Sequence, residues 1–130
     1  INNGECIKER PDFLFDCVTH YLILEVDENQ HKGRQASCEK NRMVNISQAL
    51  SMPVIFIRYN PDTYKINGKK YDDNHISRMK ELNINLKHFM NCSIDDIHEF
   101  GFASAIYLFY DEYDKLDNNV VTILDFDEDD

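Results

Sequence analysis

The sequence lacks any long run of hydrophobic residues. Its apolar runs, such as YLIL at 21–24 and VIFI at 54–57, have only the length of a β-strand, far short of the roughly 20 residues that cross a bilayer. No charged segment followed by an apolar one opens the chain, so no secretion signal is indicated. We therefore expect an intracellular protein. Because the chain begins at Ile1 rather than Met, we also expect it to be part of a longer one.

Cysteine pairs of the kind that hold zinc are also missing. The four cysteines are far apart in the sequence: Cys6, Cys17, Cys38 and Cys92. They form no CxxC motif, which is the spacing that zinc sites commonly use. A disulfide framework has no better support than zinc. We expect free thiols, as in most intracellular proteins.

Basic residues are scarce relative to acidic ones. The chain has 14 Lys and Arg against 24 Asp and Glu, a formal charge of −10, which argues against a protein that passively coats nucleic acid. Five of the acids lie in the last six residues, DFDEDD, which leaves −5 for residues 1–124. The length fits one domain, and no repeat or low-complexity linker divides it. We expect a single domain over 1–124 and an acidic tail over 125–130.

Apolar residues change between strand-like and helix-like spacing along the chain. The Asn-Gly pair inside YKINGKKY predicts a hairpin over 64–71. The predicted order is β-β-α-β-hairpin-α-β-β, an α/β (α+β) fold with a mixed central sheet flanked by helices. The expected strands are 11–16, 20–27, 54–59, 103–110 and 120–126, and the expected helices are 36–50 and 73–91, followed by a short helical turn at 93–96.

The most informative segment covers residues 10–31, RPDFLFDCVTHYLILEVDENQH. Side chains two apart on a strand share a face, so a hairpin that bends near 17–20 brings its carboxylates together. Converging carboxylates repel one another unless a cation lies among them, and oxygen-rich sites suit Mg²⁺ or Mn²⁺. The carboxylates are Asp12, Asp16, Glu25 and Asp27. Of these we set Asp16 aside, either as a residue that supports the ligands without binding the metal or as a structural one.

The remaining three acids, Asp12, Glu25 and Asp27, are the predicted ligands of a divalent metal ion. Such an ion polarises a phosphate and lowers the pKa of an attacking water. His31 lies just beyond the second strand and titrates near neutral pH. We expect it to orient or deprotonate that water.

The same segment resembles the PD-(D/E)XK, or restriction-endonuclease-like, nuclease superfamily, in particular the branch similar to very-short-patch repair endonucleases. The blocks RPDFLFD and LILEVDENQH are followed by CE..RM at 38–43 and FIRYNPD at 56–62. Uncharacterised proteins of giant DNA viruses have similar blocks in this order. The resemblance covers residues 10–66. It implies a sheet flanked by helices and divalent-metal-dependent cleavage of DNA.

By motif position, the resemblance assigns Asp12 to the first catalytic acid and Glu25 to the second. Asp27 stands where the superfamily usually has Lys. The repair-type branch also lacks that Lys and relies on a nearby His, which here is His31. Lys32 is the alternative residue for activating the nucleophile.

Further basic and polar residues are predicted to contact the substrate. Glu39 and Arg42, three apart on a helix, either form a surface ion pair or face the site. Arg58 at the end of its strand either contacts a phosphate or is ion-paired. The basic hairpin at 64–71 either grips a nucleic-acid backbone or is simply solvated. The predicted substrate-binding residues are Gln30, Lys32, Arg42 and Arg58.

The sequence therefore predicts a divalent-metal-dependent endonuclease that uses Mg²⁺ or Mn²⁺ to hydrolyse DNA phosphodiester bonds. The alternative is a nuclease-fold module that no longer cuts and instead binds protein or nucleic acid. The intact set of acids argues for the enzyme, while Asp27 in place of Lys and the negative charge argue for the module. RNA in place of DNA stays open.

Overall fold

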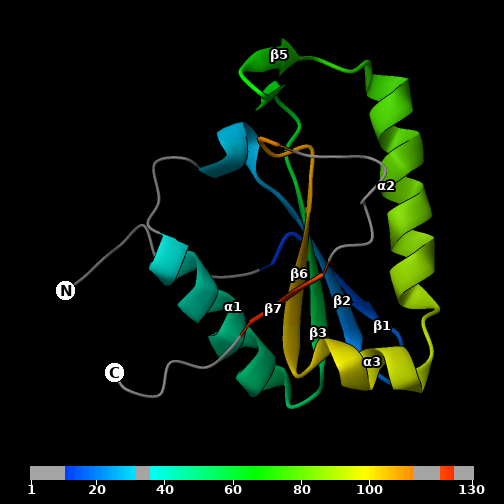
Figure 1. Cartoon of the computed structure of the whole chain (residues 1–130). Coiled ribbons are helices and arrows are strands. Elements are labelled where there is room, and N and C mark those ends of the chain that lie inside the picture. Colours follow the sequence, from blue (N-terminus) through cyan, green and yellow to red (C-terminus); the bar gives the residue numbers. More distant parts are fainter. Residues whose placement is uncertain (1–10, 32–35, 113–120, 125–130) are drawn as a thin grey trace.

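The computed structural model describes residues 11–31, 36–112 and 121–124 of the chain (Figure 1). It contains a five-stranded mixed sheet with the strand order β1-β2-β3-β6-β7. The three inner strands are parallel, and an antiparallel strand lies at each edge. This is the mixed α/β fold that the sequence predicts. The strands are β1 (Phe13–Asp16), β2 (Tyr21–Val26), β3 (Val54–Tyr59), β6 (Ala103–Leu108) and β7 (Thr122–Ile123).

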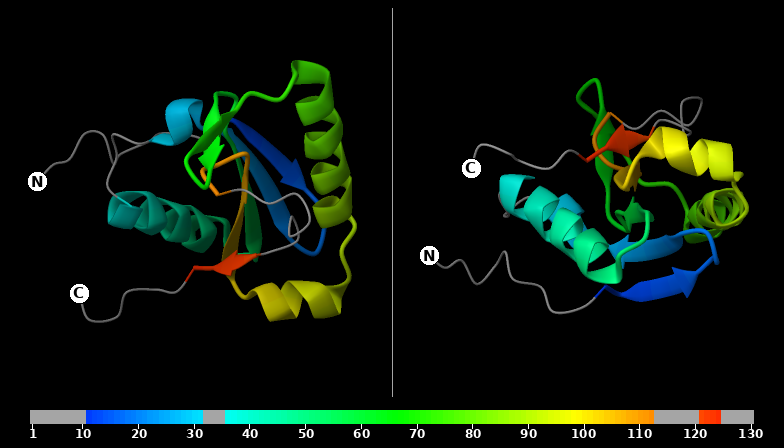
Figure 2. Two further views of the ribbon diagram at one scale, coloured as in Figure 1. Left: turned by 45° about the horizontal axis from the view of Figure 1, so that its top comes forward. Right: turned by 90° about the horizontal axis from the view of Figure 1, so that it is seen from below.

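Helices cover both faces of this sheet (Figures 1 and 2). Helix α1 (Ala36–Leu50) connects β2 to β3 and packs on one face, while α2 (His75–Met90) and α3 (Ile94–Phe100) precede β6 and pack on the other. All six residues of β3 are buried, as expected for a central strand covered on both sides. Alternate residues of each inner strand therefore enter two separate cores.

The predicted hairpin follows β3 at the end of the sheet where the parallel strands finish (Figure 1). Its strands are β4 (Tyr64–Ile66) and β5 (Lys69–Tyr71), which pair antiparallel. Asn67 and Gly68 both have positive φ, 52° and 79°, a backbone conformation that the Asn-Gly pair tolerates better than most sequences. The hairpin prediction is confirmed.

Most element bounds agree with the sequence prediction to within two residues, and those of α1 and β3 are the predicted ones. The short turn expected at 93–96 is the start of α3, capped by the Ser93 side chain. Within residues 121–124 the last expected strand covers only Thr122–Ile123, and its other expected positions, 120, 125 and 126, lie outside the described residues. The predicted acidic tail, 125–130, lies outside the described residues.

The cysteine prediction is only partly right. Cys17 and Cys92 are free thiols, but Cys38 is disulfide-bonded, so the expectation of free thiols is wrong there. Widely spaced cysteines give no sequence signal for such a bond, because their approach depends on the tertiary fold. In the described part of the chain, no helix has the length and apolar character that a membrane crossing requires.

Candidate functional site

The candidate site lies where the parallel strands end and their carboxyl ends share one edge of the sheet. Ligands of α/β proteins commonly bind at this edge. The strand register aligns Glu25 of β2 with Arg58 of β3 and Tyr107 of β6. On the other side of β2, the antiparallel register continues from the Phe13–Leu24 pair and brings Asp12 beside Glu25. The side chains of Glu25 and Arg58 in this row face α1, where they contact Arg42 and Glu39.

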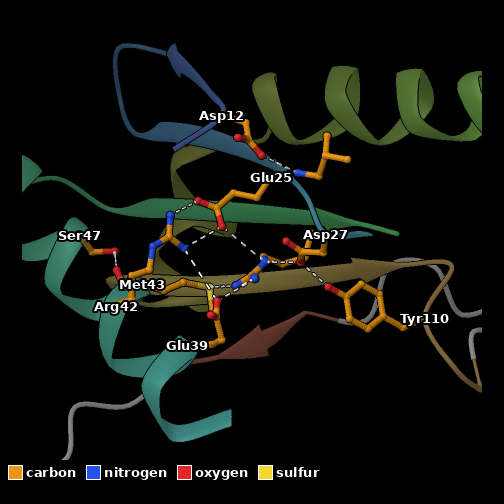
Figure 3. Close-up of polar contacts among 10 residues, drawn as sticks. Asp12, Glu25, Asp27, Glu39, Arg42, Met43, Ser47 and Tyr110 are labelled. Atoms are coloured by element: carbon orange, nitrogen blue, oxygen red, sulfur yellow. Dashed lines mark hydrogen bonds and ion pairs between the residues drawn. The ribbon is translucent and has the colours of Figure 1, made fainter. Parts of the chain in front are cut away.

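Glu25 is bound by an arginine from α1. Arg42 donates one hydrogen bond to each carboxylate oxygen, 2.8 Å to Oε1 and 2.5 Å to Oε2 (Figure 3). Both side chains are buried, with exposed fractions of 2% for Glu25 and 6% for Arg42. This bidentate geometry is among the strongest pairings available to a carboxylate.

Asp27, two residues further along, is bound by a second arginine. Arg58 donates from Nε to Asp27 Oδ2 at 2.6 Å and from Nη2 to Glu39 Oε1 at 3.0 Å. Its Nε also lies 3.6 Å from Oε1 of Glu25. Burial alone lowers the pKa of Arg58, but the hydrogen bond and charge of Asp27 and the charge of Glu25 outweigh it and raise that pKa. Arg58 is therefore a permanent cation.

Tyr110 completes the surroundings of Asp27. Its hydroxyl donates to Asp27 Oδ2 (Figure 3). Burial raises the pKa of Tyr110, and the negative charge and hydrogen bond of Asp27 raise it further. The phenol is thus neutral at physiological pH and serves as a hydrogen-bond donor.

Several predicted site residues are brought together in this way. Glu25 and Asp27 share a face, as the alternation of strand side chains predicts. Glu39 and Arg42 face the same cluster, 4.0 Å apart, so they are more than a surface ion pair. The sequence left Arg58 either to contact a phosphate or to form an ion pair, and in the structure it is ion-paired with Asp27 and Glu39. We call Glu25, Asp27, Glu39, Arg42 and Arg58 the charged cluster.

Asp12 lies at the solvent edge of this cluster. Its side chain is exposed, and its Oδ2 accepts a hydrogen bond from the Val26 N–H at 2.8 Å (Figure 3). Asp16, set aside by the sequence analysis, is exposed and accepts a hydrogen bond from the Val18 N–H in the turn between β1 and β2. That contact gives Asp16 a local structural role.

Gln30 contacts protein in this structure. It lies in η2 (Glu28–His31), a short 3₁₀ helix that follows β2. Its amide nitrogen donates to Asp111 Oδ1 at 3.1 Å, and the Asp111 N–H donates to Gln30 Oε1 at 2.8 Å. This reciprocal pair connects η2 to the segment after β6. The side chain of His31 and the whole of Lys32 lie outside the described residues.

Tyr110 and Asp111 are the site residues that sequence reasoning missed. Both lie two or three residues after the end of β6 at Leu108. Residues just beyond the carboxyl end of a parallel strand often contact ligands. A single sequence does not reveal that orientation. The available signal was the expected strand over 103–110, which ends at Tyr110.

The predicted metal ligands fit a divalent cation only in part. Asp12 and Glu25 have the right donor oxygens and share one cross-strand row, with Asp12 open to solvent. Asp27 does not fit, because it is fully buried and bound by Arg58 and Tyr110. In the described residues, no three acidic, histidine or cysteine side chains are grouped closely enough to hold a metal ion.

Comparisons with known proteins add no family assignment. No protein-family model matches the chain, and neither a curated protein nor a solved structure is significantly similar to it. The function must therefore be inferred from the residues and their geometry.

Proposed function

We propose that this chain is a divalent-metal-dependent endonuclease that hydrolyses DNA phosphodiester bonds at the edge where β2, β3 and β6 end. One observation supports it above all. The residues that carry the nuclease resemblance come from β2, α1 and β3, far apart in the sequence, and meet in the charged cluster. Buried ion pairs seldom stabilise a fold, whereas functional sites often contain clustered charges.

Asp12 and Glu25 are the proposed metal ligands. Mg²⁺ or Mn²⁺ held there would polarise a phosphate and lower the pKa of a bound water. Asp27 is not among the proposed ligands, since its buried Oδ2 is bound by Arg58 and Tyr110. His31 keeps the proposed role of orienting or deprotonating the attacking water, and Lys32 stays the alternative residue for activating the nucleophile.

The other residues of the cluster hold Glu25 in place. Asp27 and Glu39 anchor Arg58 from two sides. Arg58 lies beside Glu25, on the neighbouring strand of the same cross-strand row. The Gln30–Asp111 pair keeps η2 against the segment after β6. Because η2 carries His31 at its end, this pair also determines how the chain leaves β2 beside the site.

The test is a cleavage panel of single-stranded, double-stranded, mismatched and branched DNA, with RNA as a further substrate, in Mg²⁺, Mn²⁺ or EDTA. We expect metal-dependent cleavage that falls by about 100-fold in Glu25→Gln and in Asp12→Asn, a loss typical of damaged metal sites. Asp16→Asn is the matched control, since Asp16 is an exposed carboxylate of the same hairpin, and should cut normally. Cleavage that survives Glu25→Gln would overturn the proposal.

A second candidate is a nuclease-fold module that binds protein or nucleic acid without cutting. It is favoured by the arginine pairing of Glu25 and Asp27, and by the absence of any group of three metal-binding side chains among the described residues. The same panel separates the two candidates. Binding that is unchanged in EDTA, with no cleavage in any metal, would favour the module.

A further inference from the structure

Most of the side chains that the sequence predicts to contact substrate contact protein in the structure. Arg42 and Arg58 are buried and paired with acids of the charged cluster. Gln30 is paired with Asp111. The remaining arginine in the described part of the chain, Arg78, is buried as well. A surface that binds the backbone of DNA needs exposed cations, so another element has to supply them.

The β4–β5 hairpin supplies exposed cations at the right end of the molecule. It lies where β2, β3 and β6 finish (Figure 1). Three of the five exposed lysines among the described residues belong to it, and residues 64–71 include no acid. None of these three forms a salt bridge with a described residue. The three are Lys65, Lys69 and Lys70, and the other two, Lys80 and Lys87, lie on α2.

Two of the hairpin lysines form a like-charge pair. The antiparallel register places Lys65 directly opposite Lys70. Both lie on the face away from Tyr64 and Tyr71, because neighbouring residues of a strand point to opposite faces. Like charges directly opposite each other destabilise a hairpin. An anion beside the two ammonium groups removes this repulsion, and a phosphate of the DNA backbone is such an anion.

The aromatic side chains of the hairpin pack inward. Tyr64 is only 3% exposed, and its hydroxyl donates to Asp73 at 2.8 Å. Its ring stacks on that of Tyr71, with 5.8 Å between the centroids. The ammonium of Lys69 lies 5.6 Å from the centre of the Tyr71 ring. The hairpin therefore offers charge rather than aromatic platforms for bases, which favours contact with phosphates.

The main chain of the hairpin is fixed to the segment that follows β6. The Lys65 N–H donates to Asp111 Oδ1 at 2.9 Å, and the Glu112 N–H donates to the Lys65 carbonyl at 2.6 Å. The Asn67 N–H donates to Glu112 Oε1 at 3.1 Å. The two carboxylates thus hold the backbone of the hairpin. A two-stranded hairpin is marginally stable on its own, so these contacts fix the lysines beside the candidate site.

We propose that Lys65 and Lys70 of the β4–β5 hairpin, with Lys69 next to them, bind the phosphate backbone of DNA beside the candidate site. Contacts to phosphates position the DNA without reading its sequence. This inference rests on the proposed function in taking DNA as the ligand. It requires no metal ion, so binding and cleavage are tested separately. It assigns the phosphate contact to the hairpin in place of the two buried arginines.

The experiment measures the binding of a short fluorescein-labelled DNA duplex by anisotropy, in EDTA and over a series of salt concentrations. The hairpin variant combines Lys65→Gln with Lys70→Gln. The control combines Lys80→Gln with Lys87→Gln, which removes the same charge from exposed positions of α2. We expect the hairpin variant to bind about tenfold or more weakly, and its slope of log K against log salt to be smaller by about 2, as for two lost phosphate contacts. The control should bind like the wild type.

The hairpin variant should remain folded. Both of its lysines are exposed, and the substitutions remove their mutual repulsion, so the urea midpoint should be unchanged or higher. If the variant is less stable, the wild type supplies a second measurement. DNA should shift the amide NMR signal of Gly68 at the hairpin tip and leave that of Asn83, an exposed residue of α2, unchanged.

The outcomes separate this inference from the proposed function. Equal binding by all three proteins, or an equal loss in both variants, overturns the role of the hairpin and leaves the endonuclease standing. Hairpin-dependent binding without cleavage in Mg²⁺ or Mn²⁺ supports the hairpin and overturns the endonuclease. A second duplex of unrelated sequence should bind equally well. Binding of one sequence only, or of RNA only, would show that the hairpin does not bind the DNA backbone as proposed.

Discussion

The two faces of the sheet differ sharply at the ends of the parallel strands. On the face covered by α2 and α3, side chains such as Leu24, Ile57 and Leu108 form a continuous apolar core. On the face covered by α1, the core is apolar around Phe56 and Met43 but becomes charged toward the strand ends. Adjacent residues of β3, Ile57 and Arg58, lie on these opposite faces. Alternation along one strand thus separates two kinds of interior.

The two faces of the sheet therefore contribute differently to the stability of the fold. Burying a leucine or isoleucine side chain contributes about 1.5–3 kcal/mol, and the α2 face buries many of them. A buried ion pair gains at best a small net free energy, since desolvation offsets the attraction between the charges. The α2 face therefore accounts for the folded state, and the charged half of the α1 face calls for a functional explanation.

The strongest way to break this comparison is to remove Arg58. Arg58→Met leaves the buried carboxylate of Asp27 and the partly buried one of Glu39 without this cation, and we expect it to lower the free energy of unfolding by about 3–5 kcal/mol. Ile57→Val is the control on the opposite face, with an expected loss of about 1 kcal/mol. Urea unfolding measures both. A loss below that of Ile57→Val would show that the cluster tolerates an uncompensated charge.

Local patterns predicted the apolar half of the molecule well. The run VIFIRY defined β3, and the helical spacing of Met43, Ile46 and Leu50 defined α1, because burial and periodicity are properties of a short segment. The Asn-Gly pair determined the hairpin for the same reason.

The charged half was only partly predictable. That Glu25 and Asp27 share a face follows from alternation on one strand. Their pairing with Arg42 and Arg58 depends on the parallel register of β2 with β3 and on the rotation of α1. Those are long-range features, which one sequence does not specify. From the sequence, a row of carboxylates therefore predicts a metal site, whereas its arginine partners follow only from the tertiary structure.

The largely apolar face also buries polar residues, among them Arg78 and Asn85 of α2 and His20. His20 is fully buried; its Nε2 lies 2.7 Å from the Phe89 carbonyl oxygen of α2 and its Nδ1 2.8 Å from the Thr19 hydroxyl. His20→Leu leaves the buried Phe89 carbonyl without this partner, and we expect it to lower the free energy of unfolding by about 2 kcal/mol. The measurement is urea unfolding, with His98→Leu as the control, because His98 is exposed. A neutral effect of His20→Leu would mean that this hydrogen bond does not help to hold α2.

The smallest expected effect concerns Tyr110, and it depends on pH. Burial and Asp27 raise the pKa of Tyr110 above its ordinary value of 10.0. The folded state thus keeps the phenol proton at a pH where the unfolded chain has lost it. This contribution is complete below pH 10 and declines as pH rises above it, by about 1.4 kcal/mol per pH unit for one proton.

Tyr110→Phe removes both the hydrogen bond to Asp27 and this titration. At neutral pH we expect Tyr110→Phe to lower the free energy of unfolding by about 1.5 kcal/mol, a magnitude typical of a hydrogen bond to a charged group. Between pH 9 and about 11 the stability of the variant should fall less steeply than that of the wild type, by the slope of one proton. Burial also raises the pKa of Tyr59 and Tyr107, so some decline remains in the variant. Parallel curves would mean that Asp27 is held by Arg58 alone, and that the charged cluster does not extend to β6.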